Sequence, residues 1–239
     1  MKLEVVGSGS IFSSQNSASY LVDDKILIDI PNGGCKALKR MKKDIIDIEY
    51  IFITHFHGDH YFDLPFLLSE KYVRGNRKIT LVGNKELKKK VKAIIKLAFP
   101  SSYKKYLKGL DIKYINNRNK INAKDIEVTS VEVLHGRMNY AHGYIFNQKG
   151  NVIGFTGDSC LCEGVEQIIK ESNIVFIDTT LEIGDSSHMG IDNVVSLAKK
   201  YSNIKFITTH TKELINEKLK TIKQKNLIVG YDGMQISKE

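Results

Sequence analysis

Short apolar runs alternate with amphipathic stretches along the chain, and this alternation predicts an α/β protein. Runs of strand length occupy residues 2–7, 18–23, 25–30, 49–53, 78–82, 112–115, 126–134, 143–147, 151–155, 174–178, 204–209 and 227–229. Helical patterns occupy residues 37–43, 64–73, 86–98, 162–171, 191–201 and 212–224. No linker or low-complexity stretch interrupts the series, so we expect residues 1–239 to form a single domain.

Two of the expected turns depend on particular residue types. Asp23-Asp24 separates two strand-like runs and predicts a hairpin turn. Gly7-Ser8-Gly9-Ser10 follows the first run, but neither a Lys-Ser/Thr pair nor a helical pattern comes after it. We therefore interpret this segment as a plain loop and not as a phosphate-binding loop.

The composition is that of a globular protein. With 42% hydrophobic residues in a chain of 239, a large core can be buried. No apolar run approaches the ~20 residues that cross a bilayer, and an early acid, Glu4, argues against a secretory signal. Three cysteines (Cys35, Cys160 and Cys162) do not make a disulfide framework, which favours the reducing cytoplasm.

Basic residues are concentrated in one segment of the chain. The formal net charge is +9, and residues 84–120 hold twelve Lys/Arg and two acids, so the remainder is close to neutral. The lysines of helix 86–98, followed by Tyr103 and Tyr106, are typical of a nucleic-acid-binding face. A solvated amphipathic helix explains them somewhat better, and the nucleic-acid-binding face stays open as the alternative. Either one favours an anionic substrate.

The most unusual polar segment is Thr54-His55-Phe56-His57-Gly58-Asp59-His60, directly after the apolar run 49–53. Histidine and aspartate at a buried strand end cost desolvation free energy unless a partner compensates, and a metal ion does so. Residues two apart in an extended segment face the same side, so His55 and His57 can bind one ion together. A turn at Gly58 would direct Asp59 and His60 toward a second ion.

Three further candidate ligands follow other apolar runs. His135 comes after residues 126–134, Asp158 after 151–155, and His210 after 204–209. A lone histidine in such a position is more often a hydrogen-bonded core residue. In a chain that also carries the His-x-His-x-Asp-His segment, these residues favour a metal-dependent hydrolase.

This pattern resembles the metallo-β-lactamase superfamily and, within it, the ribonuclease Z-like phosphodiesterases. The segment His55–His60 matches the signature motif, and the resemblance covers nearly the whole chain. It implies an α/β fold, a four-layer αββα sandwich, with two divalent metal ions: Zn²⁺ by default, Mn²⁺ or Fe²⁺ as alternatives. It further implies that His55, His57 and His135 hold one metal, that Asp59, His60 and His210 hold the other, and that Asp158 bridges them.

The resemblance also implies roles for neighbouring residues. Asp59 would orient or deprotonate the attacking water as well as bind metal. Residues 177–181 lie where the relatives carry a His-Glu-Ala-Thr motif, and His188 lies where they carry His-Ser-Thr. His188, held by Asp178, would therefore donate a proton to the leaving oxygen. Asp29 would support the site from the first strands.

Other features of the resemblance are less specific. Tyr231-Asp232-Gly233-Met234 is similar to the C-terminal Asp-Gly-Met strand of the family. His142 is open between lining the substrate pocket and turning a hairpin. Asp158 follows His135 by only 23 positions, which leaves no room for the protruding arm of the tRNA-maturing ribonuclease Z enzymes, and Asp178 replaces their longer glutamate. Both departures count against tRNA 3′-end cleavage. Dimers are common in the resembled branch, so a homodimer is possible, but the sequence leaves the oligomeric state open.

We therefore expect a cytoplasmic, two-metal hydrolase that uses a metal-activated water to cleave a phosphodiester in RNA, a nucleotide or a small cyclic phosphate. Two alternatives stay open: a lactonase or thioesterase on the same fold, and a catalytically silent, metal-bearing nucleic-acid-binding module. The Asp178–His188 pair and the localised charge favour phosphodiester chemistry over the first alternative. The complete set of ligands favours an enzyme over the second.

Overall fold

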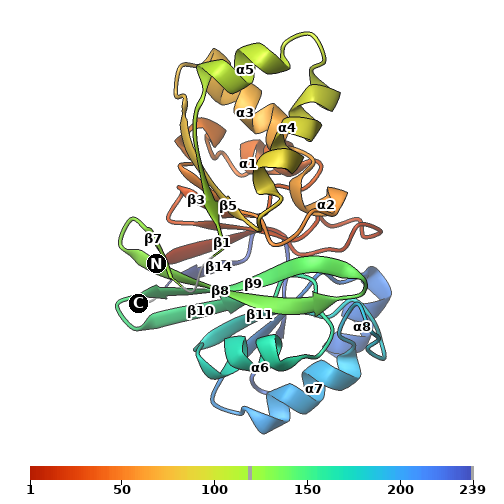
Figure 1. Cartoon of the computed structure of the whole chain (residues 1–239). Coiled ribbons are helices and arrows are strands. Elements are labelled where there is room, and N and C mark those ends of the chain that lie inside the picture. The colour runs from red at the N-terminus through yellow and green to blue at the C-terminus, as the bar shows by residue number, and fades with distance from the viewer. Residues whose placement is uncertain (118–119, 238–239) are drawn as a thin grey trace.

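Two mixed sheets pack face to face at the centre of the molecule (Figure 1). The computed structural model describes residues 1–117 and 120–237. The first sheet contains β1 (Lys2–Gly7), β2 (Ser19–Val22), β3 (Ile26–Ile28), β4 (Tyr50–Phe52), β5 (Lys78–Gly83), β6 (Asp111–Asn116) and β14 (Gln235–Ser237), in the order β14-β1-β2-β3-β4-β5-β6. The second contains β7 (Ile121–Ala123), β8 (Ile126–His135), β9 (Met138–Gln148), β10 (Asn151–Phe155), β11 (Ile174–Asp178), β12 (Lys205–Thr209) and β13 (Leu227–Val229), in the order β13-β12-β11-β10-β9-β8-β7.

Helices cover the outer face of each sheet, which confirms the predicted four-layer αββα sandwich (Figure 1). The first sheet is covered by α1 (Gly34–Arg40), α3 (Leu64–Val73), α4 (Leu87–Ala98) and α5 (Tyr103–Gly109). The second is covered by α6 (Glu163–Lys170), α7 (Ile191–Lys200) and α8 (Glu213–Lys220). The short helix α2 (Gly58–Tyr61) and a 3-10 turn at Ile45–Asp47 complete the helical segments of the described residues. No helix among those residues is long and apolar enough to span a bilayer.

Aromatic side chains fill the space between the two sheets. Phe52 of the first sheet meets Tyr144 and Phe146 of the second edge-on, at ring-centroid distances of 5.3 and 5.2 Å. Phe155 stacks on Phe176 at 5.2 Å. Two further apolar clusters lie beneath the outer helices, so each sheet is buried on both faces. Burial on both faces explains why many strands read as continuous apolar runs in the sequence.

One of the two short segments with a specific sequence-based prediction differs from that prediction in the structure. The segment Asp232-Gly233 is a turn and not the predicted strand, because Gly233 adopts a left-handed conformation (φ 84°) and the strand β14 begins only at Gln235. Asp232 accepts hydrogen bonds from the backbone and side chains of Ser8 and Asn16, which anchors the loop after β1. By contrast, the predicted hairpin turn at Asp23-Asp24 is confirmed.

The topology brings the candidate site residues to one edge of the sandwich. β3, β4 and β5 run parallel, as do β10, β11 and β12 in the other sheet. The residues that follow the carboxyl ends of these strands include most of the candidate ligands predicted from the sequence. Ligand sites of α/β sheets commonly lie outside the carboxyl ends of the strands.

A buried lysine ties helix α3 to the segment before β4. Lys71 has no exposed surface, and its Nζ donates hydrogen bonds to the carbonyl oxygens of Ile46 (2.7 Å) and Ile48 (2.8 Å). Burial lowers the pKa of Lys71 from the ordinary value of 10.5 to about 8. The two carbonyls offset part of the cost of burying the charge, and without Lys71 the carbonyl of Ile48 would lose this donor.

We expect Lys71→Ala to lower the free energy of unfolding by about 2–4 kcal/mol, because it leaves a cavity and removes two hydrogen bonds. Urea unfolding at pH 7 measures the change, and the exposed Lys78 provides the control variant Lys78→Ala. Between pH 8 and 10.5 the unfolded chain binds the Lys71 proton more tightly than the folded chain. The stability of the wild type relative to Lys71→Ala should therefore rise with pH in this interval. A flat difference would contradict the role assigned to the buried charge.

Candidate metal centre

The segment Thr54–His60 leaves β4 in an extended conformation and then turns into α2. His57 precedes the first turn of this helix, and Asp59 and His60 lie inside it. The predicted change of direction at Gly58 is therefore present, and it divides the segment into two pairs of candidate ligands. A Cβ at Gly58 would lie 2.7 Å from the ring of Phe62, so a larger residue here would have to displace that ring.

The first group of side chains converges on His57. His55 Nε2 lies 3.0 Å and His135 Nε2 lies 3.1 Å from His57 Nδ1. Nitrogen ligands about 2.0–2.1 Å from a tetrahedral Zn²⁺ are roughly 3.3 Å apart, so the separations fit a shared ion. Asp158 belongs to the same group, since one ligand atom from each of the four residues lies within 4.8 Å of the others.

The second group contains Asp59, His60 and His210. Asp59 Oδ2 lies 3.4 Å from His210 Nε2 and 3.8 Å from His60 Nε2. His60 Nε2 is buried and has no hydrogen-bond partner among the described residues. An unsatisfied buried nitrogen costs free energy, and a cation at this position would remove that cost. The residues present therefore fit a second metal ion.

Asp158 lies at the centre of both groups. Its Oδ2 is 3.3 Å from Nε2 of His60 and 3.4 Å from Nε2 of His210. The same oxygen is 3.9 Å from Nε2 of His55 and 4.0 Å from Nε2 of His135. A carboxylate surrounded by imidazoles of both groups is placed to contact two ions at once.

Hydrogen bonds fix the orientation of the candidate histidine ligands. His60 Nδ1 donates to Asp29 Oδ2 (2.8 Å), and His135 Nδ1 donates to the carbonyl of Ser187 (2.8 Å). His210 Nδ1 donates to Thr180 Oγ1 (2.7 Å). Partners of this kind hold the ring and leave Nε2 free for a metal. Asp29 thus takes the supporting position predicted from the sequence.

The backbone is strained at two of these residues. Asp29 (φ 58°) and His210 (φ 55°) both adopt the left-handed conformation at the ends of their strands. This conformation is unfavourable for residues other than glycine and is concentrated at functional sites. It turns each side chain from the strand direction toward the cluster of histidines.

The electrostatics of the cluster suit cation binding. Burial lowers the pKa of His55 well below its usual range, so its imidazole is neutral, as a ligand must be. Burial also disfavours the charged form of His60, but the carboxylates of Asp158 and Asp29 outweigh it and raise the pKa of His60 well above its usual value. Burial opposes ionisation of Asp158, whereas His210 and His60 dominate and lower its pKa. The cluster thus attracts positive charge.

His188 and Asp178 form the predicted pair beside the cluster. His188 Nδ1 donates to Asp178 Oδ2 at 2.8 Å, and Asp178 is fully buried. Thr180 also donates to Asp178 (2.6 Å), which fixes the carboxylate. Burial opposes protonation of His188, but Asp178 outweighs it and raises the pKa of the imidazole. The ring stacks on His210 at 5.3 Å, so His188 lies against the candidate ligands.

A cleft of about 530 Å³ opens at this cluster. It is lined by His57, His135, Gly136, Arg137, Met138, Asp185, Ser187 and His188. Arg137 and Met138 were not identified from the sequence, although they follow the candidate ligand His135 by two and three positions. His142 neither turns a hairpin nor lines this cleft, because it lies inside β9 and donates to the carbonyl of Tyr140 (2.9 Å).

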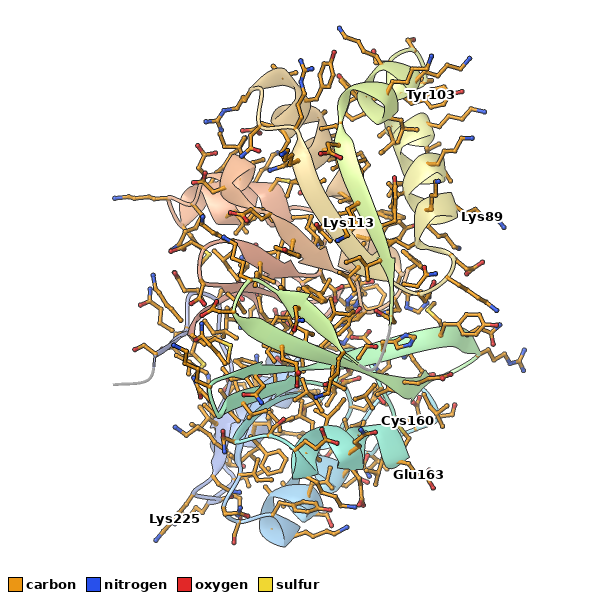
Figure 2. The ribbon with its side chains drawn as sticks, turned by 60° about the vertical axis from the view of Figure 1, so that its left-hand side comes forward. Lys89, Tyr103, Lys113, Cys160, Glu163 and Lys225 are labelled. Carbon is orange, nitrogen blue, oxygen red and sulfur yellow. The ribbon has the colours of Figure 1, made fainter. Side chains whose placement is uncertain are left out.

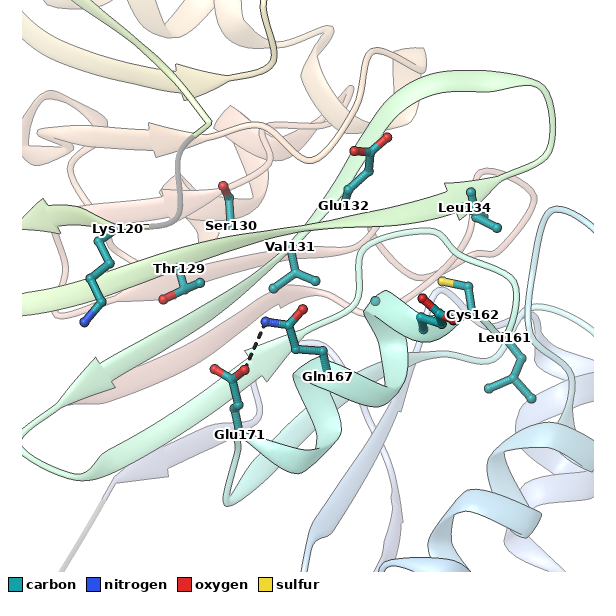
Figure 3. Close-up of a pocket in the computed structure, with 12 residues that line it drawn as sticks. Lys120, Thr129, Ser130, Val131, Glu132, Leu134, Leu161, Cys162, Gln167 and Glu171 are labelled. Carbon is teal, nitrogen blue, oxygen red and sulfur yellow. Dashed lines mark hydrogen bonds between the residues drawn. The ribbon is translucent and has the colours of Figure 1, made fainter.

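A larger groove of about 970 Å³ lies between β8 and α6 (Figure 3). Glu132 projects from β8, while Gln167 lies on α6 and is hydrogen-bonded to Glu171, the residue that follows the helix. None of the candidate metal ligands lines this groove, and three glutamates face it against one lysine. Its charge opposes an anionic substrate, so the smaller cleft at the histidines is the candidate site.

The sequence model of a family described as "Anti-Pycsar protein Apyc1" matches residues 1–229. Among curated relatives, the ribonuclease Z of Staphylococcus epidermidis is 25% identical over 244 residues, covering 80% of this chain and 79% of that protein. The ribonuclease Z of Thermococcus onnurineus is 30% identical over 127 residues, covering 52% of this chain and 38% of that protein.

Solved structures show the same fold. A diphosphatase from the PhnP family superposes with a TM-score of 0.78 at 22% identity, covering 100% of this chain and 98% of that one. The short form of human tRNase Z gives 0.75 at 19% identity, with 99% of each chain covered. The metallo-β-lactamase fold protein YhfI from Bacillus subtilis gives 0.78 at 16% identity, with 98% of each covered. The predicted metallo-β-lactamase fold is thereby confirmed.

Proposed function

The chain belongs to the family described as Anti-Pycsar protein Apyc1 and is a metal-dependent hydrolase of the metallo-β-lactamase fold, and we propose that it is a two-metal phosphodiesterase. The observation that carries the proposal is the position of Asp158 Oδ2, within 3.3–4.0 Å of Nε2 of four histidines. A carboxylate in this position suits a bridge between two ions. In the proposal His55, His57 and His135 hold one metal, Asp59, His60 and His210 hold the other, and Zn²⁺ is the default metal.

When bound, two ions would supply a nucleophilic water near neutral pH and would neutralise charge that develops on the phosphoryl oxygens. The chain itself contributes three functions. The buried Asp59 accepts a proton from the attacking water or orients it. His188 Nε2 faces away from Asp178, because Nδ1 is occupied by that carboxylate, and donates the proton to the leaving oxygen. Asp178 holds the ring and stabilises its charged form.

The substrate we propose is an anionic phosphodiester: RNA, a nucleotide or a small cyclic phosphate. The segment between His135 and Asp158 is fully described and consists of β9, β10 and tight turns, without a protruding arm. The cleft is therefore open to small substrates. The positive charge of the segment 84–120 supports an anion over a lactone or thioester. The homodimer and the cytoplasmic location remain predictions.

The test of the proposed function is hydrolysis of bis-p-nitrophenyl phosphate by the metal-loaded protein. We expect turnover that is lost on chelation and restored by readdition of about two equivalents of metal. The control substrates are a lactone and a thioester, which should not turn over. Turnover of either control, without turnover of the phosphodiester by protein that holds two metals, would replace the proposal with the lactonase or thioesterase alternative.

The lysine-rich face of α4 is the proposed contact for longer anionic substrates. Lys88, Lys89 and Lys92 are exposed, and Lys89 points away from the molecule in Figure 2. Lys90 of the same helix lies 5.9 Å from the ring of Phe56, which stands between His55 and His57 in the sequence. Helix α4 therefore packs near the segment that carries the first candidate ligands.

We expect the triple variant Lys88→Glu, Lys89→Glu, Lys92→Glu to weaken binding of a single-stranded RNA by about tenfold or more at low salt, because fewer counterions are released. Hydrolysis of bis-p-nitrophenyl phosphate should change less than twofold. The matched control reverses three exposed lysines of the other half of the molecule: Lys205, Lys223 and Lys225. Fluorescence anisotropy at several salt concentrations measures the affinity. Equal losses in both variants would show that only net charge matters and would contradict a specific face.

A further inference from the structure

The cleft at the histidines contains an arginine, Arg137, whose side chain has no partner among the described residues. Arg40 donates to Asn16, Arg74 pairs with Asp44, and Arg77 lies over the ring of Tyr72. Arg137 has no ion pair, hydrogen bond or ring contact of its side chain to any other described residue. It nevertheless lines the cleft together with His57, His135 and His188. Among the arginines of the described chain, only this one is both unpartnered and placed at the candidate centre.

The backbone that carries Arg137 is held firmly. The register of β8 and β9 shifts between Val133 and His135, and Gly136 adopts a left-handed conformation (φ 54°). Gly136 N–H donates to the carbonyl of Ser186 at 2.9 Å, and His135 donates to the carbonyl of Ser187. A Cβ at Gly136 would lie 2.8 Å from Ser187 Oγ, so the turn packs closely against the loop of His188. Irregularities of this kind re-aim side chains next to active sites.

Asp185, the acidic residue that lines the cleft, is hydrogen-bonded to backbone N–H groups and not to Arg137. Asp185 accepts hydrogen bonds from the backbone N–H groups of Ser187 (2.6 Å) and His188 (2.9 Å). It forms no ion pair with Arg137 in the structure. The guanidinium therefore has its donors available, and an incoming anion would not need to displace an internal partner. A planar guanidinium with five N–H donors matches the oxygens of a phosphate in a bidentate manner.

We propose that Arg137 binds the phosphate of the substrate through its non-bridging oxygens and thereby selects phosphodiesters over neutral esters. This inference rests on the proposed function for its substrate class, but the anion site it assigns can be measured without turnover. Met138, beside Arg137 in the cleft, adds an apolar surface for the organic part of the substrate. Arg137 is thus a binding and specificity-determining residue, distinct from the candidate metal ligands and from His188.

The experiment compares Arg137→Ala, Arg137→Lys and the control Arg77→Ala in metal-loaded protein. A lost charge-assisted pair corresponds to roughly a 10- to 100-fold change in affinity. We therefore expect Arg137→Ala to raise the KM for bis-p-nitrophenyl phosphate by about tenfold or more, with kcat within about threefold. Arg137→Lys should restore part of the loss, and Arg77→Ala should resemble the wild type. The KM of any residual hydrolysis of p-nitrophenyl acetate, a neutral ester, should be unchanged.

Binding of inorganic phosphate, measured by isothermal titration calorimetry on the same metal-loaded proteins, separates this inference from the proposed function. We expect Arg137→Ala to weaken phosphate binding by about tenfold or more. That result supports the anion site even if the wild type does not hydrolyse the diester. Unchanged phosphate affinity in Arg137→Ala, or an equal loss in Arg77→Ala, would overturn the inference while leaving a diester-cleaving wild type as a phosphodiesterase.

Discussion

Replacing Asp158 with alanine should remove both metals and lower kcat/KM for phosphodiester hydrolysis by about 10³-fold or more, since bound metals contribute several kcal/mol to the transition state. The reason is geometric: its Oδ2 lies 3.3 Å from Nε2 of His60 and 3.9 Å from Nε2 of His55, one residue from each group. Loss of one shared oxygen therefore affects both candidate ions. Loss of a residue of one group alone, as in His57→Ala, should leave the other group able to bind.

Metal content per chain, measured by mass spectrometry after dialysis, is the direct readout. The wild type should retain about two ions and Asp158→Ala close to none. Because Asp158 is buried, Asp158→Asn provides a variant of the same size, and circular dichroism checks its folding. Asp185→Ala removes a carboxylate that also lines the cleft but bonds only to backbone N–H groups, and it should keep both ions. A folded Asp158→Asn protein that still holds two ions would refute the bridging role.

The candidate ligands were predictable because they share one sequence property. Each follows a recognisable apolar run, and the carboxyl ends of parallel strands meet at one edge. His135, Asp158 and His210 are more than twenty positions apart in the chain, yet the second sheet brings the ends of β8, β10 and β12 together, and both histidines lie within 4.0 Å of Asp158. The ends of the apolar runs in the sequence thus predict which polar residues lie at the candidate site.

Other features depend on contacts that no local pattern encodes. Arg137 is unremarkable in the sequence, and its proposed role follows from its place in the cleft and from the absence of a partner among the described residues. The resemblance to a family motif predicts a strand at Asp232-Gly233. That resemblance does not indicate the left-handed conformation of Gly233, which makes the segment a turn. Helix α2 has only four residues and α5 buries none of its residues, so neither helix produces a periodic pattern. Thr180, which links His210 to Asp178, was likewise found only in the structure.

His188→Ala should separate the chemistry of the leaving group from metal binding. We expect kcat to fall by about 10²–10⁴-fold for a substrate with an alkoxide leaving group, such as a nucleoside phosphodiester. For bis-p-nitrophenyl phosphate the fall should be less than about tenfold, because p-nitrophenolate leaves without protonation. Metal content should stay at the wild-type level. A general acid predicts this contrast, whereas a metal ligand predicts equal losses for both substrates together with a loss of metal.

The dependence of kcat on pH provides a second measurement of the same role. The carboxylate of Asp178 outweighs burial and raises the pKa of His188, so the proton-donating form persists to higher pH than in a free imidazole. Asp178→Asn removes that charge, and the alkaline decline of kcat for the nucleoside phosphodiester should move to lower pH. The hydrogen bond to Nδ1 can be kept by the asparagine oxygen, so the ring stays in place. A profile that moves to higher pH, or one that His188→Ala leaves unchanged, would assign the proton donor to another group.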